Sequence, residues 1–311
     1  MRDTFSSKLV DLAHSDPKLL LLTGDHGYGL FNSLREASPQ QFINMGIAEQ
    51  NMVGVAAGLS RVGFKPIVYG LSAFIPIRVL EQIKLDVCHD NLPVIFIGDG
   101  AGFVYSHLGT SHQSTEDIAV TRAIPNLIVM SPGDRFELAR CIDLAYDSNL
   151  PVYIRLGKAD RGDVHSKNLI FNLGDLIHLK EPDPSDTRVT LVATGSMLKM
   201  ASLLCESFPS LGLVSAPSLK PINARHIKDL CEKNHTIITL EEHSIYGGLG
   251  SIISDVAASM SHATVKKLGI QDRFSEHCGS YEYLLSEHKI DFESLKVEIY
   301  NCIYSSEQAA G

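Results

Sequence analysis

Short apolar runs alternate with longer stretches of helical periodicity along the whole chain, and this alternation constrains the fold more than any other feature. It is typical of α/β proteins with mainly parallel sheets, because parallel strands need a crossover connection that is usually a helix. In the first half of the chain the expected strands are 19–22, 67–69, 94–97, 127–130 and 152–156. The helices expected around them are 1–14, 48–61, 78–89, 115–123 and 135–147.

A polar segment with two prolines, residues 180–186, interrupts the alternation. Proline disfavours both helix and internal strand, so the segment predicts a linker. After it, strands are expected at 189–193, 212–215, 236–240 and 265–268, with helices beginning near 197, 224 and 249. We therefore predict two domains, 1–165 and 188–311, each a mainly parallel sheet flanked by helices and joined by a linker at 166–187. The last residues, 305–311, are expected to fray.

The charge balance favours small-molecule chemistry over binding to a polyanion. The 311 residues carry 36 acidic and 27 basic side chains, a net charge of −9, and no basic run. Nucleic-acid and membrane surfaces attract clustered Lys and Arg, so neither partner is expected. The N-terminus lacks the apolar run of a signal peptide, and no segment is apolar enough to span a bilayer, so we expect a cytoplasmic protein. The six cysteines form no CxxC pair, which favours buried free thiols over a metal cluster.

Glu49 stands in the first turn of an otherwise apolar, Gly/Ala-rich expected helix. Acidic residues are favoured at helix N-termini because they complement the helix dipole. On this position alone, a structural role for Glu49 is favoured over a catalytic one.

The motifs around Glu49 change that balance, because they resemble those of transketolases and deoxyxylulose-phosphate synthases. Residues 43–94, which open with INMGIAEQ, are similar to the pyrimidine-binding domain of these thiamine-diphosphate enzymes. Further matching motifs are GTSHQSTEDIA at 109–119, ATGS at 193–196, SLKP at 218–221, and EEH at 241–243 followed by GGLG. The resemblance implies a pyrimidine-binding fold followed by a transketolase C-terminal-like domain. It also implies transfer of a two-carbon ketol unit between sugar-type substrates.

The resemblance implies that three residues lie against the aminopyrimidine ring of the cofactor. Glu49 matches the glutamate that hydrogen-bonds this ring and stabilises its reactive tautomer, a role for which a carboxyl in an apolar pocket is suited. Phe74 matches an aromatic residue that stacks on the ring. Ile77 stands where transketolases tend to carry a second aromatic side chain, so the contact with the ring is expected to be one-sided.

The resemblance also implies substrate contacts. His112 matches a catalytic histidine that reaches the donor's oxygens, and Arg155 matches an arginine that binds the substrate phosphate, for which a guanidinium is well suited. Asp25 matches an aspartate that faces the cofactor, and the neighbouring His26 is a further candidate substrate ligand. Asp25 and His26 follow the first expected strand at its carboxyl end, the edge where open α/β sheets bind ligands.

Two substrate positions depart from the family pattern. Gly100 stands where transketolases carry a histidine, and Leu108 stands where they carry an aspartate that binds a donor hydroxyl. His107, next to Leu108, is a candidate replacement. The identities of the donor and the acceptor therefore stay open, as does whether they are phosphorylated, free or nucleotide-linked.

A Gly-Asp-Gly sequence at 98–100, followed by Asn126, mimics the signature with which thiamine enzymes bind metal and diphosphate. In that signature the asparagine follows the second strand, whereas Asn126 precedes the strand expected at 127–130. We interpret the match as a coincidence and expect no metal site in this chain.

The resemblance therefore implies a partner polypeptide that carries the diphosphate-binding domain with its Mg²⁺ or Ca²⁺, most simply in an α2β2 assembly. The shared cofactor would be thiamine diphosphate. Three alternatives stay open: a beta subunit of a 2-oxo acid dehydrogenase, a detached part of a deoxyxylulose-phosphate synthase, and a non-catalytic scaffold relative.

Overall fold

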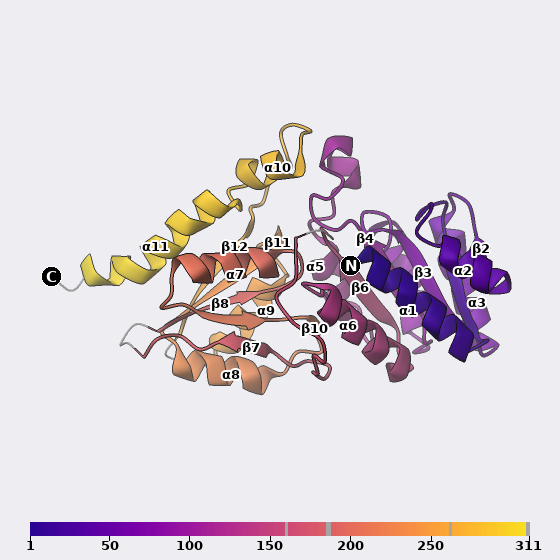
Figure 1. The fold of residues 1–311 in the computed structure, drawn as a ribbon, viewed down its shortest axis with the longest axis horizontal. Coiled ribbons are helices and arrows are strands. Elements are labelled where there is room, and N and C mark those ends of the chain that lie inside the picture. Colours follow the sequence, from indigo (N-terminus) through magenta and orange to yellow (C-terminus); the bar gives the residue numbers. More distant parts are fainter. Residues whose placement is uncertain (159–160, 185–187, 261–262, 309–311) are drawn as a thin grey trace.

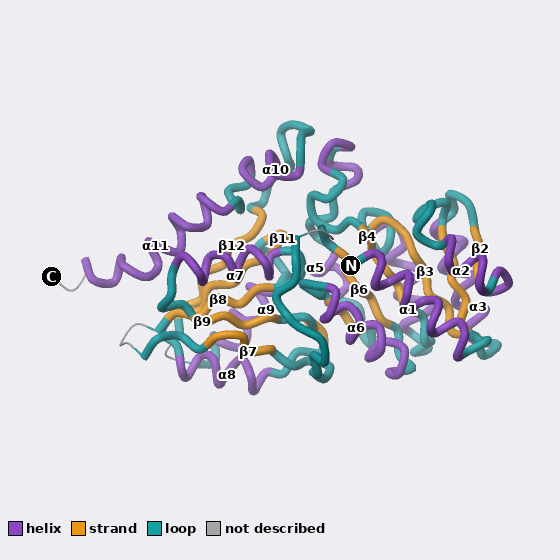
Figure 2. Tube along the Cα trace, viewed as in Figure 1, coloured by secondary structure: helices purple, strands orange, loops and turns teal. Residues whose placement is uncertain are grey.

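Two sheets with helices on both faces divide the chain between them, as the computed structural model shows (Figure 1). The structure describes residues 1–158, 161–184, 188–260 and 263–308. The expectation of two α/β domains with mainly parallel sheets is confirmed. Figure 2 shows the strands of each sheet enclosed by helices. Among the described residues, no helix combines the length and the apolar character needed to cross a bilayer.

The first sheet has seven strands in the order β10-β5-β6-β4-β3-β1-β2, all parallel except β10. The strands are β1 (Leu19–Thr23), β2 (Phe42–Asn44), β3 (Lys65–Leu71), β4 (Ile95–Asp99), β5 (Ile128–Met130), β6 (Val152–Leu156) and β10 (Ser218–Lys220). The α-helices are α1 (Arg2–Ser15), α2 (Asn32–Ala37), α3 (Glu49–Arg61), α4 (Leu80–Gln82), α5 (Asp117–Arg122) and α6 (Arg135–Ser148). The π-helix η3 (Ile83–Cys88) continues α4, and the 3₁₀ turns are η1 (Pro39–Gln41), η2 (Ile77–Val79), η4 (Ser106–Leu108) and η5 (Thr110–His112).

Alternate residues of these strands face two separate cores, as the period of a strand requires. On one face, Leu19 and Leu21 pack with α1 and α6. On the other face, Leu20 and Leu22 pack with α3, and this core continues into the second domain. Burial on both faces explains why the central strands read as unbroken apolar runs.

The second sheet has five strands in the order β12-β11-β8-β9-β7. The strands are β7 (Ile177–Lys180), β8 (Val189–Ala193), β9 (Gly212–Ser215), β11 (Thr236–Ser244) and β12 (Thr264–Ile270). The helices are α7 (Met197–Ser207), α8 (Ala224–Lys233), α9 (Leu249–Ala257), α10 (Tyr281–Glu287) and α11 (Phe292–Gln308). Residues of α7, α10 and α11 share one core, whereas residues of α8 and α9 belong to the core that reaches the first domain.

Three features differ from the sequence-based expectation. The expected linker 166–187 contains β7, which pairs antiparallel with β9 of the second sheet, and its residues 185–187 lie outside the described part. The strand β10 comes from the second half of the chain but pairs antiparallel with β5 of the first sheet. The helix α11 continues to Gln308, where fraying was expected from residue 305; residues 309–311 lie outside the described part.

Candidate functional site

Four neighbouring parallel strands, β2, β1, β3 and β4, end at the same edge of the first sheet and send out the loops that carry the candidate residues. The register aligns these ends, since Thr23 at the end of β1 pairs with Asn44 of β2 and with Tyr69 of β3. The carboxyl edge of an open parallel sheet is where such folds bind ligands. The fold therefore brings segments distant in sequence to one edge.

Glu49 begins α3 just after β2 and lies almost fully buried. One carboxylate oxygen, Oε2, accepts a hydrogen bond from Nη1 of Arg78 at 3.2 Å. The other oxygen, Oε1, is buried and has no hydrogen-bond partner among the described residues. A buried carboxylate oxygen without a partner is costly, so this atom is suited to receive a hydrogen bond from a ligand.

Aromatic and cationic side chains gather around Phe74 in the loop after β3. The His112 ring meets Phe74 edge-on with 5.3 Å between ring centroids, and the His26 ring lies 6.0 Å away. The guanidinium of Arg78 lies 4.0 Å from the Phe74 ring centroid, a distance typical of a cation–π contact. Arg78 therefore connects Glu49 to Phe74, a role that the sequence analysis did not assign to it.

The other candidate residues, Asp25, His26 and Ile77, lie on the loops at the same edge of the sheet. Asp25 is exposed in a left-handed backbone conformation, with φ of 62°, and its side chain accepts a bond from Asn44. Nδ1 of His26 is buried without a hydrogen-bond partner among the described residues. Ile77, one residue before Arg78, is partly buried and supplies no ring.

His112 is carried by a loop whose ends are joined, because Gly102 and Ser114 form an antiparallel bridge with both backbone hydrogen bonds. The single turns η4 and η5 occupy the loop between them. His107 and Leu108 are exposed on η4, whereas His112 is partly buried. The structure thus brings His112 to Phe74, while His107 and Leu108 face solvent at the tip of the loop.

Tyr105 fills the place of the histidine that the family pattern has at Gly100. A side chain built on Gly100 would overlap the Tyr105 ring, and Gly100 adopts a φ of 73°, which favours glycine. The Tyr105 hydroxyl donates to Oδ2 of Asp99 at 3.2 Å, and Arg2 pairs with the same carboxylate at 2.5 Å. Tyr105 carries no signal in the sequence that would have identified it, because its position depends on the path of the loop.

Arg155 lies in a different environment from the one expected of a substrate ligand. Its side chain is 2% exposed, and its Nε donates to both oxygens of the buried Asp117 carboxylate at 2.9 and 3.0 Å. Its Nη2 donates to the carbonyl oxygens of Ser114 and Glu242. Burial alone would lower the pKa of Arg155, but the Asp117 carboxylate raises it above its ordinary value. The guanidinium is thus engaged inside the protein, and the binding of a substrate phosphate by Arg155 stays a prediction.

The two members of the apparent metal signature lie at opposite ends of their strands. Asp99 ends β4, whereas Asn126 stands just before β5 and donates its side-chain amide to the carbonyl of Cys88. Parallel strands place these positions on opposite edges of the sheet. Asp99 and Asn126 therefore cannot bind one ion.

Two protein families match the chain in sequence. The family described as "Transketolase, pyrimidine binding domain" matches residues 1–162, and "Transketolase, C-terminal domain" matches residues 181–295. These two stretches contain the first sheet up to β6 and most of the second sheet with β10.

Several relatives are similar over most of the chain. It is 32% identical to one of the subunits of the apulose-4-phosphate transketolase of Phocaeicola vulgatus, with 94% of each chain covered. It is 31% identical to the 6-deoxy-6-sulfo-D-fructose transketolase subunit SqwH of Clostridium sp., covering 91% of this chain and 88% of that one. It is 32% identical to the 1-deoxy-D-xylulose-5-phosphate synthase of Natranaerobius thermophilus, covering 96% of this chain but only 47% of the synthase.

Solved structures share the fold over the whole chain. A structure described as a split gene transketolase in an inactive beta4 tetramer aligns with a TM-score of 0.86 and 32% identity, covering 97% of both chains. The transketolase of Campylobacter jejuni aligns with a TM-score of 0.74 at 19% identity, covering 96% of this chain and 46% of that one, a likeness of fold alone.

Proposed function

Since the chain belongs to the transketolase family, we propose that it is one subunit of a split, thiamine-diphosphate-dependent transketolase. In this proposal it transfers a two-carbon ketol unit between sugar-type substrates together with a partner. The observation that carries the proposal is the open Oε1 of buried Glu49, whose carboxylate is connected to the Phe74 ring through Arg78. The subunit-type relatives match over nearly their full length, whereas the synthases extend to about twice the length of this chain.

The residues at this edge fit the aminopyrimidine half of the cofactor. Glu49 would hold a proton on the ring nitrogen through Oε1, because that atom is buried and lacks another donor among the described residues. Phe74 would stack against the flat face of the ring, and Arg78 would keep the Glu49 carboxylate oriented. When bound, the cofactor supplies a thiazolium carbon that acts as the nucleophile.

On the substrate side, His112 would hold or move a proton at a donor oxygen. Its ring lies against Phe74 and projects from the loop that closes over the same edge. Imidazole is suited to this work because its ordinary pKa lies near neutral pH. The His26 ring, 6.0 Å from the Phe74 ring, is a second candidate to contact the donor.

The diphosphate half of the cofactor and its divalent cation are proposed to lie on the partner subunit. Asp99 and Asn126 lie at opposite edges of the sheet and so offer no diphosphate signature. The relatives named as subunits support a separate partner, and a closed α2β2 assembly is the simplest arrangement.

We expect the purified chain alone to bind thiamine diphosphate weakly and to be inactive. Adding the partner together with Mg²⁺ should produce both tight cofactor binding and ketol transfer, because each subunit contributes half of the cofactor site. Titration calorimetry with and without the partner, followed by a ketol-transfer assay, measures this. Tight, Mg²⁺-dependent binding by the isolated chain would contradict the split-enzyme proposal.

Leu108 stands where the family pattern has a hydroxyl-binding aspartate, and this departure predicts a change in donor preference. A leucine cannot hydrogen-bond a donor hydroxyl, and one such bond contributes about 0.5–1.5 kcal/mol net. Leu108→Asp should therefore raise kcat/KM about 2–12-fold for xylulose 5-phosphate relative to deoxy donors. A donor panel on the reconstituted complex checks the shift.

The exposed Leu85 offers a control for this prediction, since Leu85→Asp adds the same charge on η3. If wild type already prefers ordinary ketose phosphates and Leu108→Asp only lowers activity, the argument fails.

A further inference from the structure

The second domain contacts the loop that carries His112. We use "His112 loop" for residues 102–114, whose ends are bridged at Gly102 and Ser114. In Figure 1 the short turns of this loop stand beside the segment that precedes α10, on the same side of the molecule. η4 and η5 are single turns whose backbone hydrogen bonds stay within the loop, so contacts with other segments fix its position on the protein.

Gln113, the neighbour of His112, makes the central contact with the second domain. Its backbone is extended, with φ of −81° and ψ of 144°, so adjacent side chains point to opposite sides. His112 accordingly faces Phe74, while Gln113 is buried on the far side. There the Ser275 hydroxyl donates to Oε1 of Gln113 at 2.9 Å. Ser275 thus binds the residue next to His112 in the chain, so this hydrogen bond restrains the position of His112.

Ser275 is in turn oriented by His288. Nε2 of His288 lies 3.0 Å from the Ser275 oxygen. Because Ser275 gives its proton to Gln113, it accepts from His288, which places the imidazole proton on Nε2. The His288 ring also packs against Phe103 near the start of the loop, with centroids 4.8 Å apart. Burial lowers the pKa of His288, and the Arg273 charge lowers it further, which favours the neutral ring.

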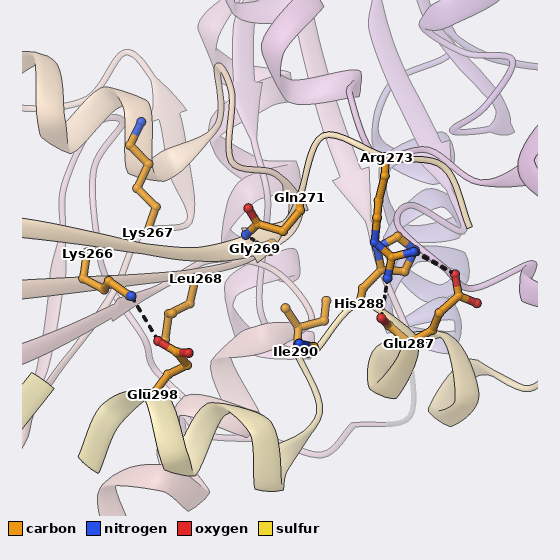
Figure 3. Close-up of a pocket in the computed structure, with 11 residues that line it drawn as sticks. Lys266, Lys267, Leu268, Gly269, Gln271, Arg273, Glu287, His288, Ile290 and Glu298 are labelled. Carbon is orange, nitrogen blue, oxygen red and sulfur yellow. Dashed lines mark hydrogen bonds and ion pairs between the residues drawn. The ribbon is translucent and has the colours of Figure 1, made fainter. Parts of the chain in front are cut away.

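The segment around Ser275 is itself anchored to the end of α10. Arg273 pairs with the Glu287 carboxylate at 3.2 Å, and the backbone amide of Glu276 donates to the same carboxylate at 2.7 Å. Figure 3 shows Arg273, Glu287 and His288 together at one side of a pocket lined by β12, α10 and α11. Cys278, on the same segment, lies next to Gly109 of the His112 loop. The second domain therefore contacts the loop at Phe103, Gly109 and Gln113.

We propose that Ser275 and His288 are positioning residues that fix the His112 loop through Gln113. Neither side chain contacts the proposed cofactor edge, so their effect on catalysis runs through the orientation of His112. The catalytic consequence rests on the proposed function, whereas the ordering of the loop does not. If these residues order the His112 loop, removing their contact with Gln113 lowers turnover and leaves the cofactor site intact.

Hydrogen–deuterium exchange on the full chain tests the loop contact independently of activity. Ser275→Ala should raise the exchange rate of peptides within 103–114 about 2–12-fold, the factor that one net hydrogen bond represents. Ser275→Thr, which keeps the hydroxyl, should restore wild-type exchange. Ser280→Ala is the matched control, because Ser280 caps α10 through the amide of Tyr283 and has no contact with the loop among its described hydrogen bonds. It should loosen α10 without changing the loop.

The same variants in the reconstituted complex test the consequence for catalysis. Ser275→Ala should lower kcat by a similar factor while partner binding, the affinity for thiamine diphosphate and the melting temperature of the chain stay unchanged. Ser275→Thr should recover the rate. His288→Gln, which keeps a donor near the position of Nε2, should retain more activity than His288→Ala.

The outcomes distinguish the positioning role of Ser275 and His288 from the proposed function. Unchanged exchange of 103–114 in Ser275→Ala would overturn the positioning role whatever the enzyme does, and so would raised exchange with unchanged kcat. Raised exchange in a wild-type complex that transfers no ketol unit would overturn the proposed function and support the loop contact.

Discussion

Replacing Glu49 with glutamine should slow ketol transfer by the reconstituted complex about 10²–10⁴-fold, the range that positioned acid–base groups contribute. Glutamine keeps the size of the side chain, and its carbonyl oxygen can still accept the hydrogen bond that Arg78 donates to Oε2. It removes the carboxylate whose open Oε1 would share a proton with the aminopyrimidine ring. The change should therefore lower kcat while assembly and the affinity for the cofactor's diphosphate stay close to wild type. Single-turnover kinetics with saturating cofactor measures the step directly.

Glu81→Gln is the matched control for this experiment. Glu81 is an exposed glutamate on α4, close in sequence to Arg78, and the substitution makes the same change of charge. It should leave kcat unchanged. Turnover near wild type in Glu49→Gln would show that Glu49 does not activate the ring and that the proposed function is wrong.

The central strands could be predicted from the sequence because each is buried on both faces and reads as an apolar run. β1, β4 and β6 agree with the runs at 19–22, 94–97 and 152–156 to within about two residues at each end. The missed strands β2, β7 and β10 are short, and each lies at an edge of its sheet. β7 and β10 also pair antiparallel with strands distant in sequence. Such pairing is decided by tertiary contacts, not by the local pattern.

Only a motif in the sequence pointed to the candidate site. The resemblance indicated Glu49, Phe74 and His112, whose roles stay predictions, and the structure connects Phe74 to the other two through ring contact and Arg78. Arg78 carries no signal of its own in the sequence, because its position along the chain does not show that it lies over Phe74. Tyr105 was missed since nothing local indicates that its ring occupies the space beside Gly100.

Arg155 shows the limit of a motif most clearly. An arginine at the end of a strand is chemically suited to a phosphate, and the sequence supports that role as well as any other. What the motif does not indicate is Asp117, 38 residues earlier, whose carboxylate is fully buried against the guanidinium. Tyr153 donates a second hydrogen bond to the same carboxylate at 2.7 Å. With Ser114 and Glu242 also bound, Arg155 joins the base of the His112 loop to the second domain.

Replacing Arg155 with methionine should therefore destabilise the chain by about 3–5 kcal/mol, because it leaves the Asp117 carboxylate buried without its counter-ion. The bond from Tyr153 satisfies only part of that carboxylate. Urea unfolding of the isolated chain, followed by circular dichroism, measures the loss as a lower midpoint at an unchanged slope. Adding Asp117→Asn should recover part of the stability, since the neutral amide no longer needs a buried cation.

Arg135 provides the matched control for Arg155. It pairs with Asp163 at 2.9 Å but is 54% exposed, and surface pairs of this kind contribute about 0–1 kcal/mol. Arg135→Met should accordingly shift the urea midpoint much less than Arg155→Met. If Arg155→Met instead unfolds like wild type and raises only the KM for phosphorylated donors, the guanidinium must turn outward in the working complex. The phosphate-binding role implied by the motif would then be correct, and the buried pair with Asp117 would describe the chain only in the absence of substrate.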